Sequence, residues 1–389
     1  MRSVELFVGA GGLAIGTARA GFHHEGIFEW DRNACDTITE NQRRKVFPAT
    51  EWPSVEPTDV RDVDFTRFEG IDLVSGGPPC QPFSIGGKHR GRTDQRNLFP
   101  EVVRAVRQSA PRAILIENVK GLTRPAFANF LEHVRLQLSY PELIQKRNED
   151  WTDHLARLEK YHTGGSKGGL RYNVVIHHAK AANYGVPQRR DRIFIVGFRN
   201  DLSPEWSFPA ETHSENALLY SQWVTREYWD YHSLSRTPSP PPRMRARIEK
   251  LKSGEIEVTE ERWRTVRDAL YDPETALPDP TKAIDTGFLN HIHNPGARTY
   301  KGHTGSPLDQ PAKTLKAGDH GVPGGENMLA HSNGKVRYFT VRESARLQTF
   351  PDDYYFAGAW TEAMRQLGNA VPVALAELVA RSIREKLEE

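Results

Sequence analysis

The chain has 389 residues and a formal net charge of only +2, so no uniformly basic or acidic surface defines its partners. Hydrophobic residues make up 38% of it and charged residues 26%, which is typical of a globular protein long enough for two domains. Two cysteines exclude a disulfide framework and a cysteine-rich zinc site, and no apolar run is long enough to cross a bilayer. The N-terminal residues enter a strand directly, so we expect no signal peptide, no membrane association, no metal and a reducing, cytoplasmic setting.

The first third of the chain alternates short apolar runs with helix-like stretches. The pattern predicts a strand at 4–8, a helix at 13–20, a strand at 26–30, a helix at 33–41, a strand at 71–74, a helix at 98–109 and a strand at 113–116. This alternation is typical of an α/β fold, in which a parallel sheet carries helices on both faces. Because ligands bind such sheets at the carboxyl ends of the strands, the residues that follow each strand are candidates for a site.

The middle of the chain departs from this alternation. Residues 142–171 are charged and end in a glycine-rich stretch, which predicts an exposed helical insertion. Apolar runs at 173–177 and 192–198 then predict two further strands.

The second half contains a long irregular region rich in Pro, Gly, Trp, Tyr and His. It runs from 202 to 335 and predicts a second, smaller, loop-dominated domain. Regular structure resumes with a helix capped by Thr340 and a closing amphipathic helix at 371–387. We therefore expect a discontinuous first domain, 1–201 with 336–389, and a second domain, 202–335.

A glycine-rich loop, Phe7-Val8-Gly9-Ala10-Gly11-Gly12, joins the first strand to the first helix. Glycines let the backbone approach a ligand closely, and the helix N-terminus offers free N–H donors. Such loops bind dinucleotides, S-adenosylmethionine or phosphates, and a tight turn without a ligand is the alternative. Glu29 ends the second strand about twenty residues later, where it can bond ribose hydroxyls, and Trp30 beside it can stack on adenine. Together they predict a nucleoside-type cofactor.

A dehydrogenase with a nicotinamide cofactor and an enzyme with a methyl donor would both use these two elements. Three features of the sequence separate the two classes. Phe7 stands where a dinucleotide-binding loop has its first glycine, and no Gly-x-Gly-x-x-Gly sequence follows. The thiol of Cys80 also has no evident role in hydride transfer. A methyl donor is therefore favoured over a nicotinamide cofactor.

A thiol in a stiff turn is the most informative feature of the chain. Gly-Gly-Pro-Pro-Cys-Gln-Pro-Phe-Ser, from 76 to 84, places Cys80 between prolines directly after a buried strand. Of the two cysteines, Cys35 falls in a predicted helix and is expected to be structural. The rigid presentation of Cys80 predicts a nucleophile, with a small buried hydrophobe as the alternative.

A carboxylate follows another strand and is expected to face the same crevice as Cys80. A thiolate adds to C6 of a pyrimidine only when the ring becomes more electrophilic, and a carboxylic acid beside N3 can cause this. Glu117 is the candidate, with a surface or helix-capping acid as the alternative. Arg190 and Arg192 alternate at the start of a later strand, so they can share a face and reach a carboxylate or a phosphate. A strand edge guarded by charge is the alternative there.

Taken together, these motifs resemble the DNA cytosine-5 methyltransferase family. The resemblance covers nearly the whole chain outside 142–171 and 202–335. It rests on seven segments in the order of the family, at 7–12, 29–30, 78–81, 117–119, 188–192, 342–348 and 366–372. It implies a Rossmann-like α/β sheet that binds S-adenosylmethionine, and a smaller, irregular target-recognition domain.

The resemblance also implies a role for individual residues. Cys80 would be the nucleophile and Glu117 the partner of N3, while Arg192 would contact the base near O2 and Arg190 would support the catalytic loop. The cofactor pocket would be lined by Phe7, Gly9, Gly11, Gly12, Glu29, Trp30, Asp59, Val60, Pro79, Leu98, Asn369 and Ala370. The DNA would be contacted by Gln81, Ser84, Lys88, Arg90, Arg92 and Lys316.

The implied reaction begins when a cytosine is flipped out of double-stranded DNA. Cys80 adds to C6, C5 takes the methyl group of S-adenosylmethionine, and loss of the C5 proton and of the thiolate restores the ring. Residues 84–96 combine glycines with basic side chains, as suits a mobile lid over DNA. Region 202–335 would read base edges in the major groove, although for any single residue such as Lys316 or His320 a phosphate contact or a plain surface position is the favoured explanation.

The leading interpretation is a sequence-specific, prokaryotic modification methyltransferase of a type II restriction–modification system. It is expected to act as a monomer on sites shared with a cognate endonuclease that need not bind it. One alternative is an RNA cytosine methyltransferase on the same scaffold, against which the long region 202–335 argues. Another is a catalytically silent DNA-binding module, against which the intact Cys80 and Glu117 argue.

Overall fold

The computed structural model describes residues 1–79, 97–165, 168–202, 205–235, 237–282, 286–300, 303–318 and 327–389. Contacts within the chain divide it into two compact units, which consist of 1–179, 191–209 and 376–389, and of 180–190 and 210–375. The expected domains, 1–201 with 336–389 and 202–335, follow from composition and have different boundaries, and the assignment of target recognition to 202–335 stays a prediction. The compact second unit also includes residues 180–190 and 336–375, which were assigned from the sequence to the cofactor-binding domain.

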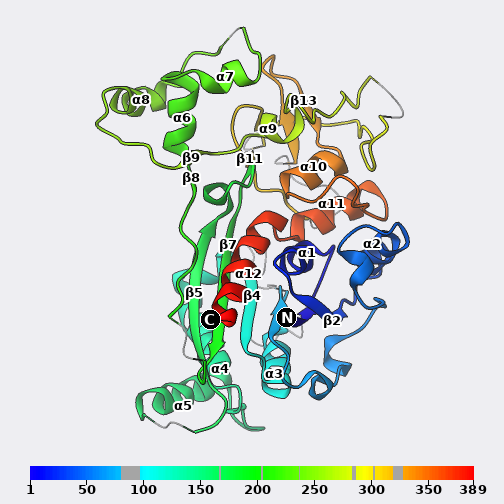
Figure 1. Ribbon diagram of the computed structural model, residues 1–389, viewed down its shortest axis with the longest axis vertical. Helices are drawn as coiled ribbons and strands as arrows, with labels where there is room; N and C mark the ends of the chain where they lie inside the picture. The colour runs from blue at the N-terminus through cyan, green and yellow to red at the C-terminus, as the bar shows by residue number, and fades with distance from the viewer. Residues whose placement is uncertain are drawn as a thin grey trace. The chain divides into compact units, whose positions relative to one another are not determined.

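A six-stranded sheet organises the first unit, in the order β2-β1-β3-β4-β7-β5 (Figure 1). Its strands are β1 (Arg2–Leu6), β2 (His23–Phe28), β3 (Leu73–Gly76), β4 (Ala113–Val119), β5 (Tyr172–Lys180) and β7 (Asp191–Arg199). Strand β1 is parallel to β2 and β3, and β3 is parallel to β4. Strand β7 runs antiparallel to β4, so the sheet is mixed rather than wholly parallel. Strands β5 and β7 are also neighbours in the sheet. The segment that joins them is too short for the crossover helix that two parallel strands require.

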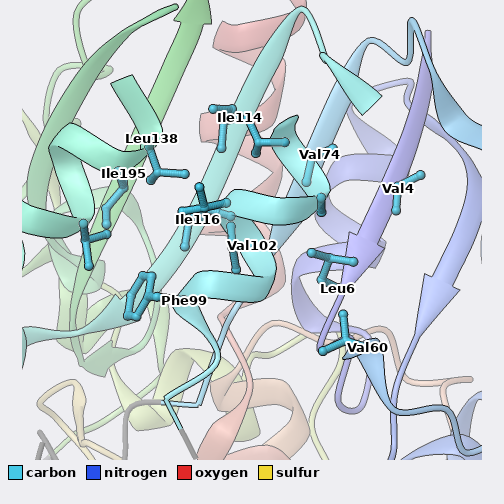
Figure 2. Packing of buried hydrophobic residues seen from close by; sticks show 14 of the residues in the cluster. Val4, Leu6, Val60, Val74, Phe99, Val102, Ile114, Ile116, Leu138 and Ile195 are labelled. Atoms are coloured by element: carbon cyan, nitrogen blue, oxygen red, sulfur yellow. The ribbon is translucent and has the colours of Figure 1, made fainter. Parts of the chain in front are cut away.

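Helices cover both faces of this sheet, which confirms the α/β fold class. The helices of this unit are α1 (Gly12–Arg19), α2 (Arg32–Arg43), α3 (Phe99–Ser109), α4 (Ala128–Ser139), α5 (Trp151–Thr163), which packs on α4, and most of α12 (Val373–Glu388). On one face, buried side chains of β1, β3 and β4 pack against α3 and α4, as Figure 2 shows for Leu6, Val74, Ile116 and Val102. On the other face α1 meets α12. A Cβ added at Gly16 would lie 2.5 Å from the Cβ of Ala376, so only glycine permits this approach.

The insertion predicted at 142–171 is confirmed as helical in α5. Leu155 and Leu158 of α5 form a small cluster with Leu136 of α4. Two buried histidines also join the helices, since Nε2 of His133 lies 3.0 Å from Nδ1 of His154. The insertion therefore has a small packed core of its own against α4.

Short elements make up the second unit, as the irregular composition predicted. Its helices are α6 (Glu215–Trp223), α7 (Glu227–Tyr231), α8 (Arg245–Lys252), α9 (Val266–Leu270), α10 (Val341–Leu347) and α11 (Trp360–Asn369). Its strands are β6 (Gln188–Arg189), β8 (His213–Ser214), β9 (Glu261–Arg262), β10 (Ser306–Pro307), β11 (Ala312–Lys313), β12 (Met328–Ala330) and β13 (Val336–Tyr338). Short 3-10 helices occur in both units. In the first unit they are Ala49–Glu51, Val60–Asp62, Phe65–Phe68, Lys120–Thr123 and Pro125–Phe127, and in the second unit they are Ala181–Tyr184 and Pro242–Met244.

Two features of the second unit bear on the predicted elements. The cap at Thr340 is confirmed, because its hydroxyl accepts from the Glu343 N–H while the Glu343 carboxylate accepts from the Thr340 N–H. Helix α11 was not predicted. Among the helices of the described ranges, none combines the length and apolarity that crossing a bilayer requires.

Candidate active site

The glycine-rich loop between β1 and α1 has the backbone conformation that its sequence predicts. Gly9 and Gly11 have φ values of 55° and 89°, in the left-handed region that glycine enters without strain. Phe7 is also left-handed, with φ 56°, which is costly for an aromatic residue. A Cβ added at Gly9 would meet no atom of the described residues within 4 Å, so this part of the chain leaves open space where a ligand can approach.

The carboxylate of Glu29 closes this loop from the end of β2. It accepts hydrogen bonds from the N–H of Gly9 at 2.8 Å and from the N–H groups of Trp30 and Asp31 at 2.9 and 2.8 Å. Burial raises the pKa of Glu29, and these three hydrogen bonds oppose that change. The Trp30 side chain is 66% exposed, so its ring is available for stacking.

The other predicted cofactor residues of the first unit differ in their accessibility. Val60 is buried in the core, and Leu98 packs against the same core from the start of α3. Asp59 pairs with Arg61 at 2.6 Å, and this guanidinium lowers the pKa of the carboxyl. Pro79 is exposed at the end of the described segment.

A buried ion pair lies where β4 and β7 run side by side. Nε of Arg192 is 2.5 Å from Oε1 of Glu117, and the two side chains are only 9% and 8% exposed. Both residues lie within strands, and Glu117 pairs in register with Phe194. The pair is held by the sheet itself, so its geometry is fixed before any ligand arrives.

The turn that leads to Cys80 lies against this ion pair. A Cβ added at Gly77 would be 3.2 Å from Oε2 of Glu117, so the turn passes close to the carboxylate. The side-chain amide of Asn118 donates to the Pro78 carbonyl at 3.2 Å, which fixes the turn to the end of β4. The described part of this turn therefore ends beside a buried carboxylate and its arginine partner.

Several predicted residues lie outside the described part of the chain. They are Cys80, Gln81, Ser84, Lys88, Arg90 and Arg92, together with His320 of the expected readers. Their roles stay predictions.

The remaining predicted residues belong to the second unit. Arg190 is 1% exposed and donates to the backbone carbonyls of Leu315, Gly368 and Ala370 at 3.0, 2.7 and 2.7 Å. Its expected support of the catalytic loop stays a prediction. Lys316 has an exposed side chain, and its backbone bonds to the Asn327 side chain through both N–H and C=O, at 2.9 and 2.8 Å. The backbone at Lys316 is thus fixed, and the residue itself is exposed.

Sequence reasoning missed two buried glutamines in the second unit. Gln188 donates to the Leu347 carbonyl and accepts from the Leu315 N–H, and Gln348 donates to the Leu367 carbonyl at 2.6 Å. Both lie inside motifs that supported the family resemblance, but a glutamine carries no chemical signal of its own. Within the described ranges, no group of three or more His, Cys, Asp and Glu side chains comes together as a metal site.

Comparisons with known proteins identify the family. The profile of the C-5 cytosine-specific DNA methylases matches residues 1–140 and 155–385, which leaves part of the insertion outside it. The type II methyltransferase M.NgoMIV of Neisseria gonorrhoeae is 31% identical over 392 residues, covering 100% of this chain and 98% of that protein. M.Eco47II of Escherichia coli, another type II methyltransferase, is 30% identical over 392 residues, covering 99% of this chain and 79% of that protein.

Solved structures agree on the fold. The Schizosaccharomyces pombe Dnmt2 methyltransferase superposes with a TM-score of 0.57 at 16% sequence identity, covering 100% of this chain and 99% of that one. The Entamoeba histolytica methyltransferase EhMeth gives a TM-score of 0.57 at 14% identity, with the same coverage. Since the family profile and the relatives cover nearly the whole length, the chain belongs to the C-5 cytosine-specific DNA methylase family.

Proposed function

We propose that this enzyme methylates C5 of one cytosine within a specific double-stranded DNA sequence and serves as the modification enzyme of a type II restriction–modification system. The observation that supports this most directly is the buried Glu117–Arg192 pair beside the turn that leads to Cys80. A buried carboxyl next to the turn that leads to a thiol suits activation of a pyrimidine ring toward addition.

In this proposal the chain's own residues act on a flipped cytosine. Cys80 adds to C6 as the thiolate while Glu117 holds a proton at N3, which draws electrons from the ring. Arg192 keeps the Glu117 carboxyl oriented and reaches toward O2 of the base. S-adenosylmethionine supplies the methyl group that C5 takes. Loss of the C5 proton and expulsion of the Cys80 thiolate then restore the aromatic ring.

The residues near the glycine-rich loop fit a nucleoside with a cationic sulfur. Open space above Gly9 admits the ligand, and the exposed Trp30 ring offers a stacking surface for adenine. Glu29 contributes a buried carboxylate that accepts from the Gly9 N–H of the loop, and in this proposal it also accepts from ribose hydroxyls. Asp59 belongs to the same proposed pocket, and Asn369 and Ala370 stay proposed cofactor residues of the second unit.

In this proposal the second domain recognises the DNA. We assign target recognition to 202–335 and include Lys316, an exposed residue with a fixed backbone. A monomeric state, the prokaryotic cytoplasm as the setting and a cognate endonuclease acting on the same sites also belong to this proposal.

The test is transfer of labelled methyl groups to duplex DNA and, in parallel, to transfer RNA. Incorporation into duplex DNA alone supports the proposal, and incorporation into transfer RNA alone favours the RNA enzyme. Bisulfite sequencing of DNA from cells that express the chain then gives the recognition sequence and the modified position. Methylation spread over cytosines without a common sequence would contradict the modification role.

A further inference from the structure

A single buried guanidinium ties together two distant segments of the second unit. Arg190 donates to the carbonyl of Leu315, near the end of the expected target-recognition region, and to the carbonyls of Gly368 and Ala370. These acceptors lie 125 to 180 residues further along the chain. A fully buried arginine bonded to backbone carbonyls of two segments holds them at a fixed separation, because guanidinium donors project at fixed angles.

Two glutamines form a second set of hydrogen bonds between the same segments. Gln188 accepts from the Leu315 N–H and lies 3.2 Å from the Gln348 side chain. Gln348 in turn donates to the carbonyls of Leu367 and Ala370 at 2.6 and 3.2 Å. All of these groups are buried, so breaking one contact would leave polar atoms without partners.

Direct contact completes the junction. A Cβ added at Gly368 would lie 2.2 Å from the backbone nitrogen of Ala317, closer than atoms can approach. The two backbones therefore touch at this glycine, and any side chain there would force them apart. One of the touching segments, 315–317, includes Lys316, and the other, 368–370, includes two residues of the proposed cofactor pocket.

We propose that Arg190 is a positioning residue that couples cofactor binding to DNA binding, because it joins the 368–370 segment to the 315–317 segment. This inference rests on the proposed function of both segments. Because the junction holds the two segments at a fixed separation, a ligand that shifts one segment also shifts the other, so each ligand changes the affinity for the other by the same factor. Lysine cannot replace Arg190, because one ammonium group cannot span both sets of carbonyls in the same geometry.

The experiment measures this factor in the full-length enzyme. The dissociation constant of S-adenosylhomocysteine is determined by calorimetry without DNA and with saturating duplex DNA that carries the recognition sequence. We expect DNA to tighten binding to the wild type by about tenfold, within the usual range for linked sites. In Arg190→Lys the ratio of the two constants should fall close to one, even if both affinities are also lower.

A second variant reaches the same junction by a different change. Gly368→Ala inserts a methyl group between the two backbones and should also bring the ratio close to one. Matched controls are Arg381→Lys, an exposed arginine of α12, and Gly168→Ala, where an added Cβ meets no described atom within 4 Å. Both controls should keep the wild-type ratio.

The outcomes separate this inference from the proposed function. Failure of the wild type to bind S-adenosylhomocysteine or DNA would overturn the proposed function itself. If the wild type binds both ligands and methylates DNA, but its two dissociation constants for S-adenosylhomocysteine are equal, only the coupling is overturned. That measurement needs no variant. A wild-type ratio retained in a folded Arg190→Lys or Gly368→Ala protein also overturns it.

Discussion

Glu5 provides a quantitative test of how the first unit is built. It lies in β1, is 0% exposed, and accepts a hydrogen bond from the Ser75 hydroxyl, while its other oxygen has no hydrogen-bond partner among the residues that the structure describes. Burial raises the pKa of Glu5 from 4.5 to about 8, opposed only in part by the Ser75 hydrogen bond. The folded enzyme should therefore keep this carboxyl protonated at neutral pH, where an unfolded chain has released the proton.

The direction of the pH effect follows from this difference. Below pH 4.5 both states carry the proton, and the contribution of Glu5 to stability is fully present. As the pH rises from there to about 8, the free energy of unfolding falls, because unfolding releases a proton. The slope is about 1.4 kcal/mol for each pH unit, so the whole interval is worth at most about 5 kcal/mol.

The assay is chemical denaturation of the wild type and of Glu5→Gln between pH 5 and pH 8.5. The amide stays neutral, so the stability of Glu5→Gln relative to the wild type should increase with pH by at least about 2 kcal/mol. Any cost of burying the amide is a constant offset at all pH values. Glu51→Gln, at an exposed position, is the matched control and should follow the wild type. A difference between the wild type and Glu5→Gln that stays flat with pH would refute the reasoning.

Three further predictions test separate parts of the account. Burial raises the pKa of the Cys35 thiol to about 12, so a thiol reagent at pH 8 should label Cys80 first, and a fast phase that survives in Cys80→Ser would contradict this. Trp30→Ala should weaken S-adenosylmethionine binding by about tenfold, from lost stacking, without changing the melting temperature of the free enzyme. Burial lowers the pKa of His133 to about 4 and also lowers that of His154, so stability of the insertion should be lost as pH falls from 6.5 toward 4. Hydrogen exchange of α5 amides, corrected for intrinsic rates, should therefore be faster at pH 5 than at pH 7, and equal protection would argue against the histidine pair as the cause.

Local sequence pattern predicted most of the first unit. Apolar runs located the strands within a few residues, but β4 continues through Glu117 and Asn118, which a pattern reading takes as the end of a strand. Polar residues persist in this strand because β7 pairs with them and Arg192 neutralises the carboxylate. Those partners lie far along the chain, so no local window contains them.

Long-range contacts also explain what sequence could not specify at the site. The position of Glu29 predicted a ribose contact, whereas its hydrogen bond to Gly9 depends on how β2 lies beside the loop. Arg190 appeared in a family motif, yet its acceptors come from segments that no spacing rule relates to it. Helix α11 escaped prediction because its N-terminus has no side-chain cap, which removes the usual start signal.

The central claim is that Cys80 forms a covalent bond to a flipped cytosine, and trapping tests it most directly. Duplex DNA that carries 5-fluorocytosine at the recognised position is incubated with the enzyme and S-adenosylmethionine, because fluorine at C5 blocks the elimination that would release the thiolate. We expect a denaturation-resistant complex whose adduct maps to the peptide containing Cys80 and is absent in Cys80→Ser. Efficient methylation of normal DNA without any such complex, or an adduct that persists in Cys80→Ser, would contradict it.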